Sequence, residues 1–219
     1  MHISLTENLN EVINLTSEVI FEKHASGIRE YCSYIIQFNE ATDSTGKSQI
    51  CFIFRYMLQS DVKEVFCGFV DAYEEAKILN YRKLEAKALA AIVLKFVEKL
   101  RLDKMKCIGI CTNTCNLMTG SNSGTFVELK KTIPQISHFL CLNHISSLAI
   151  LDSFKLSSDI NNGLQLIRDL NSFFCSAKRI KELEDYLSNF DFRKLRGICF
   201  TRWSEIFQVS FSFFFNKNI

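Results

Sequence analysis

The chain has 219 residues, of which 47% are apolar and 23% charged, with one proline and eight glycines. This composition excludes a disordered segment, a collagen-like repeat and a linker-rich array, and the length suits one domain or one and a half. Basic residues number 26 and acidic residues 24, so the formal charge is only +2. A charge this small does not attract nucleic acid by itself, and any such binding must come from local patches.

The N-terminus and the cysteines indicate the cellular compartment. Residues 1–10 contain neither the basic nor the apolar region of a secretory signal, so we expect an intracellular protein. The nine cysteines are then expected to stay reduced, as small buried side chains or as ligands. No apolar run approaches the length that spans a bilayer, so no membrane partner is expected.

The first third of the chain predicts a helical lead-in over residues 1–30 and then three strands. Apolar and aromatic runs at 32–38, 49–58 and 62–71 are separated by polar segments too short to contain crossover helices. We therefore expect an antiparallel meander. Its buried side chains are expected to include five phenylalanines: Phe38, Phe52, Phe54, Phe66 and Phe69.

Helical and strand patterns alternate after the meander. The predicted elements are a helix at 81–102, a strand at 106–113, a helix at 123–133 with Ser123 as its N-cap, a strand at 137–142 and a helix at 144–154. The order βββαβαβα predicts a mixed α+β fold and is the order of an RNase H-like core. After residue 157 the pattern is purely helical.

Several motifs occur in a specific order. They are Ile36-Gln37-Phe38-Asn39-Glu40-Ala41-Thr42-Asp43, Phe54-Arg55-Tyr56, Phe66-Cys67-Gly68-Phe69-Val70, the segment 107–120 ending in Met118-Thr119-Gly120, Cys141-Leu142-Asn143-His144, Asp152-Ser153 and Thr201-Arg202-Trp203. Together they resemble the core of a hAT-superfamily transposase, in the branch shared by transposon-derived DUF4371 and MYM-type zinc-finger proteins. The resemblance implies an RNase H-like core at 31–156, interrupted after its fifth strand by a helical insertion. Residues 157–219 would be the first part of that insertion.

Active members of that family hold two divalent metals with two aspartates and a glutamate, and the metals drive phosphoryl transfer on DNA. Asn39 and Asn113 stand at the positions of the two aspartates, and the glutamate position, beyond the insertion, has no counterpart in this chain. An amide keeps the shape of a carboxylate but lacks the charge that holds Mg²⁺. We therefore expect no enzyme activity and no cofactor. Mg²⁺ or Mn²⁺ would bind only if the site were rescued, for which Glu40 and Asp43 are the nearest carboxylates.

Three further features allow two interpretations each. Cys141 and His144 resemble the structural start of the insertion, although with Cys111 and Cys115 they could form a zinc site. Trp203, with Arg202, is a candidate DNA contact by stacking on a base, and core packing is the alternative. The lysines and arginines of 81–106 could contact phosphates or form a solvated helix face. A phenylalanine-rich tail at 211–215 has no counterpart in the family and reads as sequence past a break in the gene.

The functional hypothesis is a degenerate, truncated transposase core, nuclear if functional, whose residual role is to bind DNA or a protein. One alternative is a metal-dependent transposase or nuclease that is active only with a full-length relative. Another is an interaction module that interferes with such a transposase. No small-molecule substrate is evident.

Overall fold

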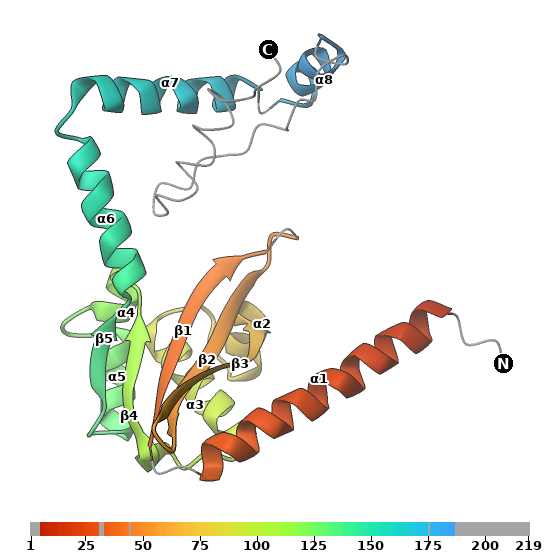
Figure 1. Cartoon of the computed structure of the whole chain (residues 1–219), viewed down its shortest axis with the longest axis vertical. Coiled ribbons are helices and arrows are strands. Elements are labelled where there is room, and N and C mark those ends of the chain that lie inside the picture. Colours follow the sequence, from red (N-terminus) through yellow and green to blue (C-terminus); the bar gives the residue numbers. More distant parts are fainter. Residues whose placement is uncertain (1–4, 31–32, 44, 175, 187–219) are drawn as a thin grey trace. The chain divides into compact units, whose positions relative to one another are not determined.

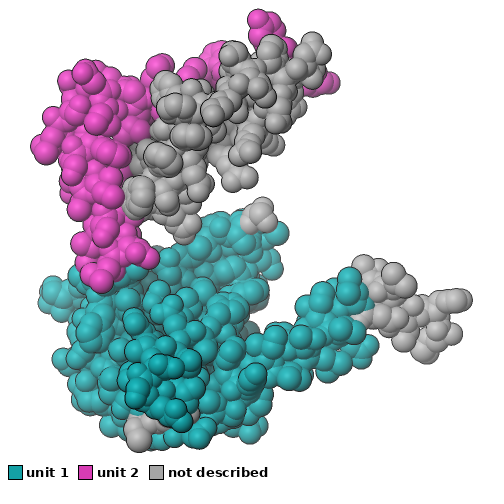
Figure 2. All heavy atoms as spheres, in the orientation of Figure 1, with its two compact units in different colours: residues 1–141 teal, residues 142–219 magenta. Residues whose placement is uncertain are grey.

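A mixed five-stranded sheet with helices is the centre of the fold (Figure 1). The computed structural model describes residues 5–30, 33–43, 45–174 and 176–186. The chain divides into two compact units, residues 1–141 and 142–219 (Figure 2). The expected mixed α+β class is confirmed, while the finer division into a lead-in, a core and an insertion stays a prediction.

The sheet combines an antiparallel meander with two parallel strands. Its strands are β1 (Tyr34–Thr42), β2 (Ser48–Leu58), β3 (Asp61–Asp71), β4 (Cys107–Thr112) and β5 (Ser137–Leu140). They lie in the order β3-β2-β1-β4-β5. The pairs β1–β2 and β2–β3 are antiparallel because short turns connect them, whereas β1–β4 and β4–β5 are parallel and need helical connections. The predicted meander is confirmed.

Helices of the first unit pack against this sheet (Figure 1). They are α1 (Leu5–Glu30), α2 (Ala72–Ile78), α3 (Ala86–Lys99), a 3₁₀ turn (Lys104–Lys106), α4 (Asn116–Thr119) and α5 (Thr125–Thr132). Helix α1 does so only with its C-terminal part, where Ala25 and Ile28 are buried, while residues 9–20 are exposed. Alternate side chains of β1 and β2, including Phe38, Phe52 and Phe54, are buried against the helices in one core cluster. Phe96 of α3 is at the centre, where its ring stacks on that of Phe52 with centroids 4.0 Å apart.

Phe66 and Phe69 were expected in this core, and that prediction is wrong. Their side chains are 53% and 64% exposed. Residues three apart on a regular strand face opposite sides, but a bulge in β3 puts both phenylalanines on the same side. Phe66 pairs with Ile53 and Gly68 pairs with Phe52, so that one extra residue lies between them. Gly68 adopts the positive φ of 132° that the bulge requires. The extra residue shifts the alternation of side chains, and both phenylalanines lie on the face opposite Phe52.

Helix boundaries differ from the predictions in two places. The helix expected at 81–102 is the shorter α3, Ala86–Lys99, and α2 lies before it as a helix that was not predicted. The sequence does not predict α2, because the only residues that it buries are two alanines. Asp71 is its N-cap and accepts hydrogen bonds from two backbone N–H groups. Ser123 is not the N-cap of α5, a position that Gly124 occupies.

The second unit is helical where the structure describes it. Its helices are α6 (Leu142–Phe154), α7 (Ser158–Phe174) and α8 (Ala177–Tyr186). Leu164 and Ile167 of α7 are buried, and the helical pattern predicted after residue 157 is confirmed for the residues that the structure describes there. No described helix is both long enough and apolar enough to cross a membrane. Arg202, Trp203 and the tail at 211–215 lie outside the described residues.

Candidate functional site

Asn39 and Asn113 lie side by side in the first unit, although 74 positions separate them in the chain. Asn39 is near the carboxyl end of β1, and Asn113 directly follows β4, the parallel neighbour of β1. The Asn113 side-chain Nδ2 donates to Asn39 Oδ1 over 3.1 Å. The fold therefore brings together the two positions at which the resemblance implies catalytic aspartates.

Neighbouring groups hold Asn113 in this orientation. Its Oδ1 accepts from the backbone N–H of Cys115 at 3.1 Å, while its carbonyl accepts from the Thr112 hydroxyl at 3.0 Å. The same hydroxyl lies 2.9 Å from Nε2 of His138, and the His138 ring stacks on Phe126. Burial lowers the pKa of His138, so the neutral ring is favoured. The strand end that carries Asn113 is thus held by uncharged hydrogen bonds.

This arrangement provides little for a metal ion. The two amides bond to each other and to a backbone N–H, and neither has a negative charge. Among the residues that the structure describes, no three His, Cys, Asp or Glu side chains are grouped so that they could hold a metal ion. Divalent cations such as Mg²⁺ prefer anionic oxygen ligands, which the pair lacks.

The two carboxylates considered as substitutes have other partners. Glu40 is adjacent to Asn39 in β1 and accepts a hydrogen bond from the Ser48 hydroxyl. Asp43 organises the turn between β1 and β2, since its Oδ1 accepts from the Thr45 backbone and hydroxyl at 2.8 and 2.6 Å. These bonds, with one from Gln49, lower the pKa of Asp43 to about 2. Both acids are thus engaged in the β1–β2 hairpin.

The low pKa of Asp43 makes the stability of the hairpin depend on acid pH. Because the folded pKa lies below the unfolded value of about 3.9, ionised Asp43 stabilises the protein above that value, and the effect is lost as pH falls through about 2. We expect Asp43→Asn to melt at a lower temperature than the parent at pH 5 and the difference to close toward pH 2. Thermal melts of both proteins across this range test it. A difference that is the same at every pH would contradict the assignment.

The other candidate ligands, Cys141 and His144, belong to different units of the chain. Cys141 follows β5 and donates its backbone N–H to the Thr112 carbonyl at 2.8 Å, whereas His144 lies in α6 of the second unit. Cys111 is half-buried in β4, where burial and then the nearby Cys141 raise its pKa, and Cys115 is exposed before α4. The structural role of Cys141 and His144 stays a prediction.

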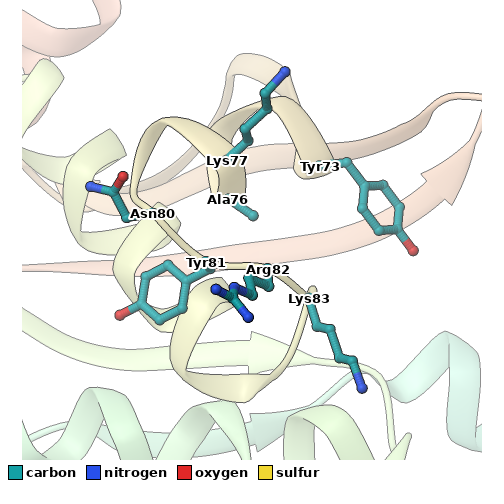
Figure 3. Close-up of a pocket in the computed structure, with 7 residues that line it drawn as sticks. All are labelled: Tyr73, Ala76, Lys77, Asn80, Tyr81, Arg82 and Lys83. Carbon is teal, nitrogen blue, oxygen red and sulfur yellow. The ribbon is translucent and has the colours of Figure 1, made fainter.

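A second candidate site is a pocket of about 540 Å³ beside α2 (Figure 3). Its lining comes from α2 and from the connection to α3: Tyr73, Ala76, Lys77, Asn80, Tyr81, Arg82 and Lys83. The basic stretch beginning at residue 81 was visible in the sequence. The contribution of Tyr73 and Lys77 was not, because α2 itself was missed.

No known protein-family model matches the chain. Its likeness to transposases therefore rests on the motifs quoted above.

Proposed function

We propose that this chain is a transposase-derived protein with an RNase H-like core that has lost catalysis and binds DNA or a protein partner. The mixed sheet supports this proposal, since β1 lies between its antiparallel neighbour β2 and its parallel neighbour β4. In such a core the ends of β1 and β4 would carry the first two metal-binding acids. A role on DNA would place the protein in the nucleus.

The Asn113–Asn39 hydrogen bond is the observation that carries the proposal. Two carboxylates at this separation would repel each other and would need a cation between them. Two amides instead satisfy each other, because one supplies a donor and the other an acceptor. The site is therefore stable without a metal, which suits a protein that no longer performs phosphoryl transfer.

Restoring the acids tests this proposal. We expect isothermal titration to detect no Mn²⁺ binding by the parent and clear binding by the double variant Asn39→Asp, Asn113→Asp, because two carboxylates replace the amide pair. The double variant Asn39→Ala, Asn113→Ala is the control, since it breaks the same hydrogen bond without adding charge. Mn²⁺ binding by the parent that Asn113→Ala abolishes, or nicking of DNA by the parent, would overturn the proposal. Failure of the Asp variant to bind Mn²⁺ would count against a metal-site ancestry of these positions.

A further inference from the structure

We propose that the pocket beside α2 binds single-stranded nucleic acid, with cations on the phosphates and Tyr73 against a base. This inference goes beyond the proposed function because it concerns a different site and does not depend on Asn39 or Asn113. It rests on the charges, the hydrogen-bonding groups and the exposed ring that line the pocket.

The pocket is basic and has no acidic side chain in its lining. Lys77, Arg82 and Lys83 have no ion pair with any residue that the structure describes. The nearby Glu75 is occupied by Lys95, whose Nζ lies 2.7 Å from its carboxylate. Three uncompensated cations around one hollow favour an anionic ligand.

The backbone of the pocket is held in place before any ligand binds. At the end of α2 the Asn80 N–H donates to the Lys77 carbonyl at 2.9 Å, and the Tyr81 N–H donates to the Ala76 carbonyl at 2.8 Å. Asn80 adopts a φ of 63°, which turns the chain sharply toward α3. Tyr81 packs against the hydrophobic core. This arrangement fixes the start of the segment that carries Arg82 and Lys83.

The directions of the side chains suit an extended polyanion rather than one small anion. Figure 3 shows Lys77 and Lys83 extending in opposite directions, with Arg82 between Tyr81 and Lys83. Cations spread in this way can contact successive phosphates of a strand, whereas a single phosphate would require them to converge. A volume of about 540 Å³ lies within the range of pockets that hold ligands of nucleotide size.

Tyr73 distinguishes a single strand from a duplex. Its side chain is 60% exposed and extends on the same side of the view as Lys83 (Figure 3). An exposed aromatic ring beside cations can stack on an unpaired base, and this contact tolerates any sequence. The bases of a duplex are stacked on one another and leave no face for Tyr73. An acidic protein segment would use the cations but would gain nothing from the ring.

Fluorescence anisotropy with a labelled oligothymidylate tests the proposal on the full chain. We expect the parent to bind and the double variant Arg82→Ala, Lys83→Ala to bind at least tenfold more weakly. The slope of log affinity against log salt should become shallower by about 0.7 for each phosphate that the variant no longer neutralises. Lys104→Ala is the matched control, because Lys104 is an exposed lysine that does not line the pocket, and it should leave affinity within about twofold.

Substitutions of Tyr73 separate stacking from charge. We expect Tyr73→Ala to weaken binding about tenfold and Tyr73→Phe to retain it, because the ring is kept. No binding by the parent, or an equal loss in Lys104→Ala, would overturn the proposal. So would equal competition by a duplex of the same length or by polyglutamate, or full affinity in Tyr73→Ala. Circular dichroism and melting temperature confirm that each variant is folded, and Mn²⁺ titration of the asparagine pair remains an independent result.

Discussion

Phe96→Ala is expected to lower the free energy of unfolding of the first unit by about 3–5 kcal/mol. Phe96 is 4% exposed. The centroid of its ring lies 4.0 Å from the ring centroid of Phe52, 6.3 Å from that of Phe54 and 6.2 Å from that of Phe21. It therefore joins three elements, since these partners belong to β2 and α1 while Phe96 belongs to α3. Removing the ring leaves a cavity between helices and sheet. Because domains are stable by only about 5–15 kcal/mol, such a loss removes a large share of the stability of the unit.

Phe69→Ala is the control for this prediction. The Phe69 side chain is 64% exposed on the opposite face of β3, so its loss should change stability by less than about 0.5 kcal/mol. Urea unfolding followed by circular dichroism compares the two variants with the parent. Similar losses in both would show that the bulge in β3 does not direct Phe69 to the exterior. A loss near zero in Phe96→Ala would contradict the central place assigned to that ring.

Gly124→Ala is expected to destabilise the first unit by about 1–3 kcal/mol. A Cβ at residue 124 would lie 2.5 Å from the backbone nitrogen and 2.6 Å from the carbonyl oxygen of Gly120. It would also lie 2.8 Å from the carbonyl oxygen of Met118. All three are backbone atoms, so no side-chain rotation relieves the overlap. The turn between α4 and α5 would have to open and would strain the 2.8 Å hydrogen bond from Gly124 N–H to Gly120.

Gly163→Ala provides a contrast in the same chain. Gly163 lies inside α7, and a Cβ there would meet nothing within 4 Å. Alanine is the better helix former, so this substitution should stabilise the helix by about 0.5–1 kcal/mol. Thermal melts of both variants test the pair of predictions. Equal effects of the same sign would mean that the packing around Gly120 and Gly124 is looser than the structure has it.

The sequence and the structure agree best where the signal is local. Apolar and aromatic runs predicted β1 and β2, and Phe38, Phe52 and Phe54 are buried as expected. The same reasoning misplaced Phe66 and Phe69, because a bulge changes which face each residue occupies and leaves only a glycine as a trace in the sequence. Helix α2 was missed since alanines, rather than large apolar residues, form its buried side.

The candidate sites show the same division. The motifs in the sequence singled out Asn39 and Asn113 one at a time, through their likeness to a transposase pattern. Their hydrogen bond, and the role of Glu40 and Asp43 in the hairpin, depend on strand pairing. Likewise, the basic stretch after residue 80 was evident, whereas its partnership with Tyr73 and Lys77 required α2 to be in place.

By itself, then, the sequence determined that this is an ordered mixed α+β chain, that its meander precedes alternating helices and strands, and that uncharged amides occupy positions 39 and 113. Only the tertiary structure decided that those amides touch, that two phenylalanines face outward and that three cations and a tyrosine share one hollow. The physical reason is that periodicity and charge are properties of neighbouring residues. The contact across 74 positions instead follows from the parallel pairing of β1 with β4, and the outward phenylalanines follow from a bulge where β3 pairs with β2.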